Sequence, residues 1–283
     1  MSIKIIRMTL FCMGVVGTMA LSRPGIANTD WTSQLQQLAQ SELRSAEHRA
    51  RNEYRSPVQT LQFFGLQPDM SVLEIWPAHG WYTEILAPFL KDQGQLTLAQ
   101  FRHNDGSLKD ERSIFWARVS QRLAQRITEQ ADYFGQPRFV ELDPPLLYPA
   151  TTDQFDMILT FRNAHIWNET GHLADTLQTL FSLLKPGGVL GMVEHRAAKL
   201  SDISSSAVEG YLDESYVIDA AEQAGFKLVA SSEINANPAD SKNYPKGVYA
   251  LPPTLAMGLQ DKALYQAIGE SDRMTLKFVK PAG

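Results

Sequence analysis

Short apolar runs alternate with amphipathic stretches between residues 71 and 225. The apolar runs predict strands at residues 72–76, 96–101, 138–142, 155–161 and 189–193. Apolar residues three and four positions apart predict helices at residues 115–127, 173–184 and 217–224. A strand that is apolar throughout is typical of a sheet buried on both faces. The pattern therefore indicates an α/β fold in which helices cover both faces of a parallel sheet.

The last part of the chain follows a different pattern. Residues 226–234 predict a sixth strand, and residues 235–272 form an insertion rich in Asn, Pro and Gly. Met274, Leu276 and Phe278 then alternate with more polar neighbours, which is typical of an antiparallel, partly exposed strand. We therefore expect a seven-stranded sheet whose last strand is antiparallel.

The N-terminal segment has the pattern of a signal peptide. Lys4 and Arg7 precede an apolar stretch at residues 8–21, and small residues follow at residues 25–27. The stretch is shorter than the roughly 20 residues of a membrane span. We therefore expect a signal peptide at residues 1–27, export to the periplasm or beyond the cell, and no stable membrane insertion after cleavage. An uncleaved N-terminal anchor is the alternative.

The remaining chain divides into two parts. Residues 28–70 are expected to form a helical segment packing on the core, because apolar positions at residues 31–46 have helical spacing. Residues 71–283 are expected to form the main domain, with the insertion at residues 235–272. The sequence does not specify an oligomeric state.

Composition excludes several classes of function. Cys12 is the only cysteine and lies in the predicted signal peptide, so the mature chain has no disulfide, thiolate metal site or cysteine nucleophile. Removing residues 1–27 takes away Lys4, Arg7 and Arg23 and no acidic residue, which moves the formal net charge from -5 to -8. Such an acidic chain has no basic surface for nucleic acid.

The first predicted strand leads into a loop of small residues before a helix. Glu74 lies in the strand, and Trp76, Pro77, Ala78 and Gly80 follow it. This arrangement is typical of nucleotide binding, because backbone N–H groups approach the ligand at the start of the helix. With only one glycine, the loop taken alone also fits an ordinary strand-to-helix connection.

The loop and several other motifs together resemble the class I S-adenosylmethionine-dependent methyltransferases, and more closely a subgroup of exported bacterial methyltransferase-like proteins. The motifs that carry the resemblance are Tyr54-Arg55-Ser56-Pro57, Glu74-Ile75-Trp76-Pro77, Gly80-Trp81-Tyr82-Thr83-Glu84, Phe161-Arg162-Asn163 with His165 and Trp167, Leu184-Lys185-Pro186-Gly187-Gly188, Glu194-His195-Arg196, Ser232-Glu233-Ile234-Asn235-Ala236-Asn237-Pro238 and Gly269-Glu270-Ser271-Asp272-Arg273. The resemblance implies a Rossmann-like seven-stranded sheet with the last strand antiparallel, and S-adenosylmethionine as cofactor. It implies cofactor-binding roles for Glu74, Trp76, Pro77, Ala78, Gly80, Tyr82, Gln100, Asp143 and Asn163.

Three positions depart from the pattern of these methyltransferases. Ala78 and His79 stand where the family favours glycine, which serves positive φ and close backbone approach. We expect His79 to add bulk beside the methionine part of the cofactor. Gln100 stands near the end of the second strand, where the family has an acid for the ribose hydroxyls. For Asp143 two interpretations stay open, a contact to the adenine amino group or a turn residue before Pro144.

The ends of the fourth and fifth strands carry the candidate catalytic residues. His165 and His195 are candidate general bases, because the pKa of histidine lies nearest working pH. Each also fits a structural histidine bonded to the backbone. Arg162 and Arg196 are candidates for binding an anionic acceptor, since a guanidinium group matches carboxylate geometry.

Two further segments are expected to form the wall of the acceptor pocket. One is the N-terminal segment at Tyr54 and Arg55, and the other is the insertion at residues 235–272. The candidate lining residues near or within the insertion are Tyr244, Tyr249, Glu270, Asp272 and Arg273.

No metal site is expected. His165 and His172 are seven residues apart and have no cysteine partner. Two hypotheses for function result. The first is an exported methyltransferase that uses S-adenosylmethionine on a small-molecule acceptor. The second is a ligand-binding or otherwise repurposed protein on the same fold, favoured by Ala78 and His79.

Overall fold

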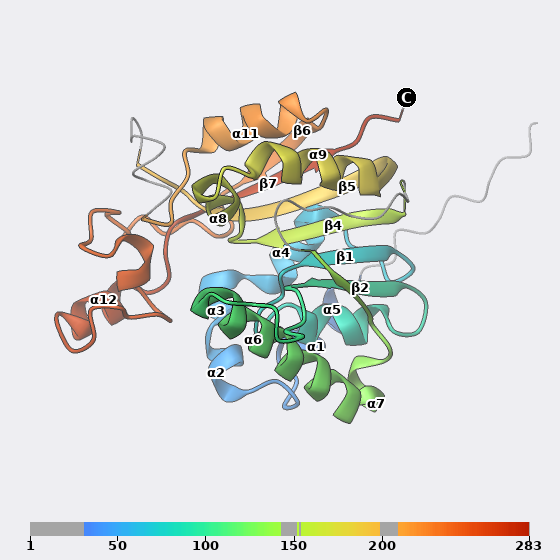
Figure 1. Ribbon diagram of the computed structural model, residues 1–283, viewed down its shortest axis with the longest axis horizontal. Helices are drawn as coiled ribbons and strands as arrows, with labels where there is room; N and C mark the ends of the chain where they lie inside the picture. Colours follow the sequence, from blue (N-terminus) through green and yellow to red (C-terminus); the bar gives the residue numbers. More distant parts are fainter. Residues whose placement is uncertain (1–30, 143–151, 153, 199–208, 283) are drawn as a thin grey trace, which may run out of the picture. The chain divides into compact units, whose positions relative to one another are not determined.

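A computed structural model describes residues 31–142, 152, 154–198 and 209–282 (Figure 1). The predicted signal peptide and Asp143 lie outside these residues. Among the helices of the described residues, none is long and apolar enough to cross a membrane.

A seven-stranded sheet forms the centre of the fold, in the order β3-β2-β1-β4-β5-β7-β6 (Figure 1). The strands are β1 (Ser71–Ile75), β2 (Gln95–Gln100), β3 (Arg138–Glu141), β4 (Phe155–Phe161), β5 (Leu184–His195), β6 (Lys227–Ser232) and β7 (Arg273–Val279). Strands β1 to β5 pair in parallel, whereas β7 is antiparallel to both β5 and β6. The predicted sheet and its antiparallel last strand are therefore confirmed.

Strand β5 differs from its prediction at its start. The segment at residues 185–188, whose Pro and Gly residues indicate a turn, lies inside the strand. Leu184 pairs with Phe155 and Val189 with Met157, so β5 has several extra residues between two pairs that are close together on β4. A β-bulge of this kind accommodates Gly187, which has φ +80°.

Helices cover both faces of the sheet (Figure 1). The helices are α1 (Thr32–Ala39), α2 (Ala46–Ala50), α3 (Asn52–Arg55), α4 (Pro57–Phe64), α5 (Thr83–Leu90), α6 (Glu111–Glu129), α7 (Ala131–Phe134), α8 (Ala164–Glu169), α9 (Leu173–Leu183), α11 (Glu214–Gln223) and α12 (Lys262–Ile268), with a 3₁₀ turn η1 (Gly247–Ala250). Neighbouring residues of each central strand point to opposite faces, so Val72 belongs to one apolar cluster and Leu73 to the other.

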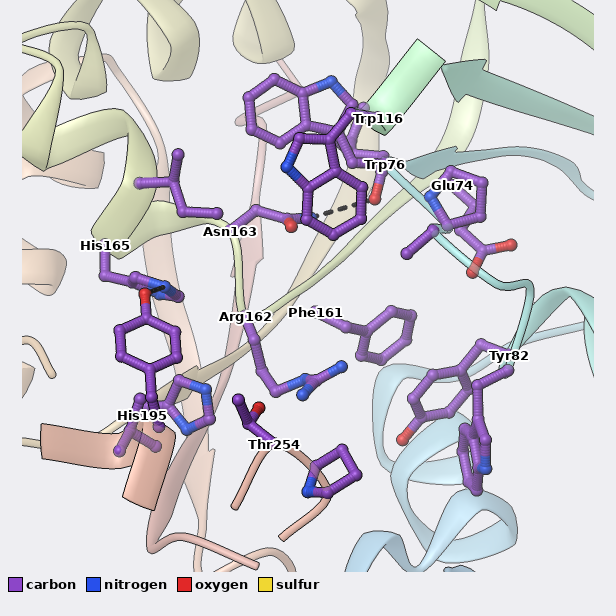
Figure 2. Close-up of a pocket in the computed structure, with 18 of the residues that line it drawn as sticks. Glu74, Trp76, Tyr82, Trp116, Phe161, Arg162, Asn163, His165, His195 and Thr254 are labelled. Carbon is purple, nitrogen blue, oxygen red and sulfur yellow. Dashed lines mark hydrogen bonds between the residues drawn. The ribbon is translucent and has the colours of Figure 1, made fainter. Parts of the chain in front are cut away.

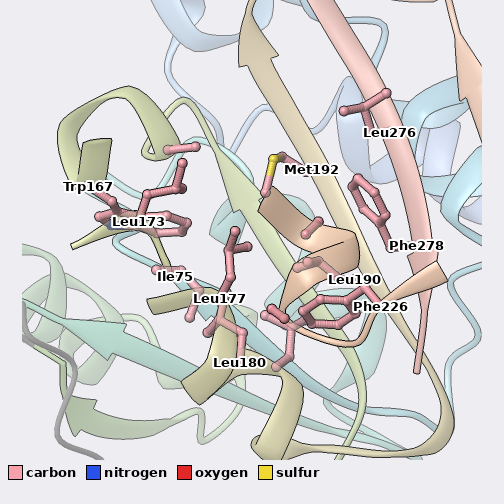
Figure 3. Packing of buried hydrophobic residues seen from close by; sticks show 14 of the residues in the cluster. Ile75, Trp167, Leu173, Leu177, Leu180, Leu190, Met192, Phe226, Leu276 and Phe278 are labelled. Carbon is pink, nitrogen blue, oxygen red and sulfur yellow. The ribbon is translucent and has the colours of Figure 1, made fainter. Parts of the chain in front are cut away.

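One apolar cluster joins α8, α9 and α11 to β1, β5 and β7 (Figure 3). Leu177 and Leu180 of α9 pack there with Leu190 of β5 and Phe278 of β7, and all four are fully buried. The opposite cluster joins α1, α4, α5 and α6 to the other face. Because both faces are covered, the central strands present only their ends to solvent, and those ends are where a ligand site can form.

The N-terminal helices pack on α5 and the sheet. The helix predicted at residues 31–46 is shorter, because α1 ends at Ala39 and α2 begins at Ala46 after Ser45, whose hydroxyl accepts a hydrogen bond from the His48 N–H. Leu35 of α1 and Phe64 of α4 lie in the same buried cluster as α5. The N-terminal segment is thus part of the main core.

A buried carboxylate ties the N-terminal segment to α5 and α6. Glu84 of α5 is fully buried and lies 3.1 Å from Nε of Arg44, 2.9 Å from Nδ1 of His48 and 2.5 Å from Nη2 of Arg126. Burial alone would raise the pKa of Glu84, but His48 and Arg126 outweigh it and lower the pKa. This ionic cluster connects three parts of the chain that are distant in sequence.

Candidate functional site

A cavity of about 360 Å³ opens at the carboxyl ends of β1 and β4 (Figure 2). Its walls come from the loops after β1, β2, β4 and β5, from α6, and from the segment around η1. The lining residues are Arg55, Glu74, Ile75, Trp76, Pro77, Ala78, Trp81, Tyr82, Phe101, Arg112, Trp116, Phe161, Arg162, Asn163, His165, Ile166, His195, Val248, Tyr249, Pro252, Pro253 and Thr254. In open α/β sheets this edge is where ligands bind.

The loop after β1 has the left-handed backbone that the sequence analysis expected of glycines. Trp76 has φ +45°, Ala78 +50° and Gly80 +80°. For a residue with a side chain, the left-handed region costs about 1–2 kcal/mol. The tight turn is therefore formed even though alanine replaces glycine at residue 78, and the rest of the fold compensates this cost.

Glycine is required at residue 80 for a second reason, which is the lack of space for a side chain. A Cβ atom at this position would lie 2.6 Å from Cδ1 of Leu123, a buried residue of α6. Glycine at residue 80 therefore lets the loop approach α6.

Replacing Gly80 by alanine should destabilise the protein by about 2–4 kcal/mol, from left-handed strain and overpacking against Leu123. Gly171→Ala is the matched control, because Gly171 has φ +76° and no atom within 4 Å of its added Cβ. Urea denaturation should show a loss at least about 1 kcal/mol larger for Gly80→Ala. Equal losses would contradict the close approach as the reason for glycine.

Glu74 lies at the base of the cavity. Its side chain is buried, and Oε2 accepts a hydrogen bond of 2.7 Å from the hydroxyl of Thr83 at the start of α5. Burial raises the pKa of Glu74 to about 8, and the hydrogen bond from Thr83 only partly opposes this. The carboxyl group is therefore mainly protonated at neutral pH, and a positively charged ligand group would favour its ionised form.

Three aromatic rings form one wall of the cavity. The ring of Phe101 stacks on Trp76 at a centroid distance of 4.5 Å and on Trp116 at 5.1 Å. The indole N–H of Trp76 donates to the carbonyl of Leu142 over 2.7 Å, which holds that ring in place. Flat apolar faces of this kind suit a heterocyclic base.

Asn163 and Tyr82 line the middle of the cavity. The Asn163 amide N–H donates to the carbonyl of Ile75 over 3.0 Å, so the end of β4 is tied to the end of β1. The ring of Tyr82 stacks on Phe161, with centroids 3.6 Å apart. These contacts place the loop after β1 beside the residues that follow β4.

Two buried histidines line the far end of the cavity, and the buried carboxylate of Glu194 lies next to them. Nδ1 of His165 lies 3.0 Å from Oε1 of Glu194, and this carboxylate also accepts from the backbone N–H of His195 over 2.7 Å. Nε2 of His165 lies 3.4 Å from the hydroxyl of Tyr249, and the two imidazole rings are 5.5 Å apart. Because Glu194 accepts the Nδ1 proton of His165, Nε2 is left as a proton acceptor.

His195 is held neutral. Burial lowers its pKa well below the ordinary histidine value, and the positive charges of Arg162 and Arg273 lower it further. Nδ1 of His195 is within hydrogen-bonding distance of the Ser271 hydroxyl. This imidazole is therefore an uncharged group in an electropositive part of the cavity.

The arrangement of His165, Glu194 and His195 as possible metal ligands was not expected from the sequence, where only the spacing of His165 and His172 was considered for a metal site. One ligand atom from each lies within 4.8 Å of the others, which is the arrangement of a candidate cation site. Both oxygens of Glu194 already accept hydrogen bonds, and arginines surround His195. This electrostatic environment favours anions over metal ions.

Arg162 projects into the cavity from the end of β4 (Figure 2). Its backbone is left-handed, with φ +62°, and its N–H donates to the carbonyl of Val193 on β5 over 2.7 Å. Arg55 reaches the same cavity from α3, and its guanidinium group lies over the ring of Trp81 at 4.7 Å. The structure thus brings together two arginines that are 107 residues apart.

Most cofactor-site residues expected from the sequence line this cavity, namely Glu74, Trp76, Pro77, Ala78, Tyr82 and Asn163. Gly80 lies in the same turn. The structure corrects the expected cofactor contact of Gln100. Its side-chain amide donates a hydrogen bond to the carbonyl of Ser120 on α6, and the side chain does not line the cavity. The next residue, Phe101, faces the cavity instead.

The structure also corrects the expected position of His79. It is exposed and lines a different depression, beside His48 and Arg122, so it does not add bulk to the cofactor cavity. Its pKa is lowered by partial burial and by the charges of His48 and Arg122. The loop turns between Ala78 and Gly80, which directs the His79 side chain away from the cavity.

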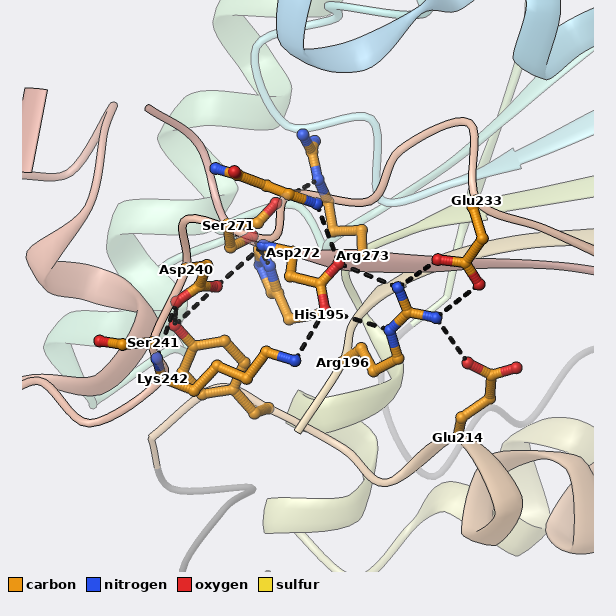
Figure 4. Close-up of polar contacts among 12 residues, drawn as sticks. His195, Arg196, Glu214, Glu233, Asp240, Ser241, Lys242, Ser271, Asp272 and Arg273 are labelled. Atoms are coloured by element: carbon orange, nitrogen blue, oxygen red, sulfur yellow. Dashed lines mark hydrogen bonds and ion pairs between the residues drawn. The ribbon is translucent and has the colours of Figure 1, made fainter. Parts of the chain in front are cut away.

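The structure corrects the expected role of Arg196 in binding the acceptor. Its guanidinium group contacts Glu214 at 3.1 Å, Glu233 at 2.5 Å and Asp272 at 3.0 Å (Figure 4). It therefore stabilises the packing of α11 and the ends of β6 and β7, and it does not line the cavity.

The two expected wall segments contribute in part. Arg55 and Tyr249 line the cavity, whereas Tyr244, Glu270, Asp272 and Arg273 lie outside its lining. Residues 252–254 of the insertion also line the cavity, whereas Trp116 and Arg112 line it without having been expected. Both residues belong to α6, and which side of this helix faces the cavity depends on how α6 packs.

Comparisons with known proteins identify the fold. No family model matches the chain, and no curated protein matches it in sequence. Among solved structures, the chain is similar to a SAM-dependent methyltransferase from Aquifex aeolicus, with a TM-score of 0.53, 14% identity, and coverage of 88% of this chain and 98% of that one. It is also similar to the [4+2]-cyclase SpnF, with a TM-score of 0.54, 16% identity and 81% coverage of both chains.

A third similar structure is a SAM-dependent methyltransferase from Methanosarcina mazei, with a TM-score of 0.50, 12% identity, and coverage of 79% of this chain and 98% of that one. Together with the strand order, these likenesses show that the chain has the Rossmann-like fold of the class I methyltransferases.

Proposed function

We propose that the chain is an exported methyltransferase that uses S-adenosylmethionine to modify a small molecule. The observation that carries the proposal is the cavity at the ends of β1 and β4, where Glu74, the turn at Ala78 and Asn163 surround one space. Its volume of about 360 Å³ lies in the range of small-molecule sites, roughly 300–1,000 Å³.

The residues around the cavity fit the chemistry of this cofactor. The aromatic wall formed by Trp76, Phe101 and Trp116 suits an adenine ring. The Glu74 carboxyl can accept a hydrogen bond from a ligand ammonium group or hydroxyl. S-adenosylmethionine supplies an activated methyl group together with its leaving group, so the protein mainly has to position the acceptor.

His165 is the residue we assign as general base. With Nδ1 donating to Glu194, its Nε2 can take the proton of an acceptor hydroxyl or amine, and the Glu194 carboxylate then stabilises the imidazolium ion. The neutral His195 lies beside it and can hold the acceptor through a hydrogen bond. Tyr249 closes this end of the cavity.

Export is proposed from the N-terminal pattern of basic, apolar and small residues. An uncleaved anchor that leaves the domain in the cytoplasm is the alternative. A periplasmic reporter fused after residue 40 should give a signal if the chain is exported, and should stay silent if the domain faces the cytoplasm.

A repurposed ligand-binding protein is the second candidate. It is favoured by the strained alanine at residue 78 and by Gln100, which turns away from the cavity and leaves the ribose without an acidic partner. SpnF, a [4+2]-cyclase of similar fold, illustrates that this fold also serves chemistry other than methyl transfer.

Calorimetric titration with S-adenosylmethionine and S-adenosylhomocysteine separates the two candidates. A methyltransferase should bind both at a 1:1 ratio with micromolar dissociation constants, and should transfer a labelled methyl group to a small molecule that co-purifies with it. No heat at millimolar ligand would reject the methyltransferase function. Binding without any transfer to co-purified molecules would favour the second candidate.

A further inference from the structure

We propose that the methyl acceptor carries a carboxylate group, which Arg162 binds with the help of Arg55. Calling the carboxylate-bearing molecule the methyl acceptor rests on the proposed function. The carboxylate site itself stands on the positions and partners of these two arginines.

The guanidinium group of Arg162 has no direct ion-pair partner among the described residues, although the charges of Glu270 and Glu194 act on it. Within the described residues, this group makes no hydrogen bond or ion pair, although it lies inside the cavity between Phe161, Tyr82 and Thr254 (Figure 2). Burial lowers its pKa, which means that the charged form is desolvated. A desolvated cation with unused N–H donors is what a ligand anion would stabilise.

Arg55 offers the second set of donors. Its side chain is only 3% exposed, and its Nη2 atom is buried without a hydrogen-bond partner in the described part of the chain. Its Nε donates to Glu270 over 2.9 Å, so one side of the guanidinium group is held by the protein. The charge of Arg162 lowers the pKa of Arg55, after the larger effect of burial, which shows that the two cations act on each other.

The local charges do not balance. Glu270 is shared by Arg51 at 2.6 Å, Arg55 at 2.9 Å and Arg273 at 3.1 Å, and Glu194 is occupied by His165. The single carboxylate of Glu270 therefore pairs with three arginines, and Arg162 adds a fourth positive charge to this part of the protein. An added anion would restore the balance and relieve the repulsion among the guanidinium groups.

The surroundings specify the kind of anion. A guanidinium fork matches a carboxylate in plane, with two parallel hydrogen bonds. The stacked rings of Phe161 and Tyr82 place apolar surface next to Arg162, and His165 and His195 lie on the other side (Figure 2). The site therefore fits a carboxylate on a flat apolar body whose nucleophilic group reaches the histidines.

A carboxylate could come from two sources, the acceptor or the methionine part of the cofactor. Arg55 lies near Tyr82 at the start of α5, close to the cofactor loop, whereas Arg162 follows Phe161 and precedes the histidines. The position of Arg162 beside the candidate base favours the acceptor. The two sources are distinguished by ligands that contain or lack the amino-acid part.

The test uses benzoate as the carboxylate probe and benzamide as its neutral counterpart, each titrated into the full protein by calorimetry. We expect benzoate to bind at least tenfold more tightly than benzamide, and Arg162→Met to remove at least tenfold of the benzoate affinity. Arg162→Lys should restore part of it. Arg118→Met is the matched control, an exposed arginine of α6 outside the cavity lining, and should stay within twofold of wild type.

The cofactor arm uses S-adenosylhomocysteine and 5′-methylthioadenosine, which lacks the amino-acid part. Unchanged affinity of Arg162→Met for both supports the acceptor as the source of the carboxylate. A loss confined to S-adenosylhomocysteine overturns the proposal and assigns the arginine to the cofactor. Equal binding of benzoate and benzamide, or no benzoate binding at about 10 mM, also overturns it. If S-adenosylhomocysteine does not bind the wild-type protein, the proposed function is rejected. The benzoate and benzamide titrations then still decide whether the carboxylate site exists.

Discussion

Replacing Glu84 by glutamine should lower the free energy of unfolding by about 3–5 kcal/mol, the typical cost of removing one partner from a buried ion pair. Glu84 and Arg44 both have fully buried side chains, and Arg44 would be left as an uncompensated cation. His48 and Arg126 would lose the same partner. Urea denaturation of the variant at neutral pH measures the loss.

The exposed pair of Glu169 and Arg112 provides the control. These side chains lie 3.8 Å apart and are 34% and 53% exposed, so Glu169→Gln should cost less than about 1 kcal/mol. A loss at Glu84 no larger than this would contradict a structural role for the buried cluster.

The same carboxylate gives a pH dependence with a definite sign. Because the folded protein lowers the pKa of Glu84, its contribution to stability is present above the unfolded pKa of about 4.3 and is lost as pH falls through the folded value. Wild type should therefore lose more stability than Glu84→Gln between pH 5 and pH 3.

Binding of S-adenosylhomocysteine should release a proton from Glu74 at pH 7. The Glu74 carboxyl, with its pKa raised to about 8, is protonated in the free protein, and a ligand ammonium group favours the ionised form. Affinity should therefore rise by up to about tenfold per pH unit from pH 6 to pH 8 and level off above that range. Calorimetry in two buffers of different ionisation enthalpy counts the released protons.

Glu74→Gln tests the assignment of that proton. The variant should release none, and at pH 8 its affinity should be roughly 10–100-fold lower, because a charge-assisted hydrogen bond contributes about 1.5–3 kcal/mol. Thr83→Val is a milder variant that removes only the hydroxyl bonded to Glu74, and the proton release should persist. Proton release that survives in Glu74→Gln would assign it to another group.

The strands were predictable because burial on both faces leaves an unambiguous apolar run. Each of β1, β2 and β4 was predicted to within one residue at either end. The alternation at Met274, Leu276 and Phe278 correctly predicted an antiparallel β7, but the expected partial exposure is wrong, because β7 lies between β5 and β6 and is mostly buried. The start of β5 was not predicted, because Pro186 and Gly187 are residues typical of a turn. In the structure these residues form a bulge in β5 against β4.

The site was predictable where it follows strand ends and unpredictable where it depends on side-chain direction. His165 and His195 were placed together because β4 and β5 end at the same edge. Gln100 and His79 were placed wrongly, because the direction of each side chain depends on the local backbone and on the packing of α6.

The sequence analysis expected Arg55 in the pocket wall and Arg162 at the acceptor, but no local pattern indicated that the two arginines act on one site. Arg55 lies on α3 in the N-terminal segment and reaches the cavity only because that segment packs on α5 through residues such as Phe64 and the Glu84 cluster. Contacts of this range follow from the packed tertiary structure rather than from local pattern.

The central claim is that the cavity binds the cofactor. A crystal structure determined after soaking the crystals with S-adenosylhomocysteine tests it most directly. The proposed function predicts ligand density between Glu74 and Asn163, with the adenine against Trp76 and Trp116, and the sulfur atom directed toward Arg162 and His165. Density at another site, or an empty cavity at saturating ligand, would contradict it.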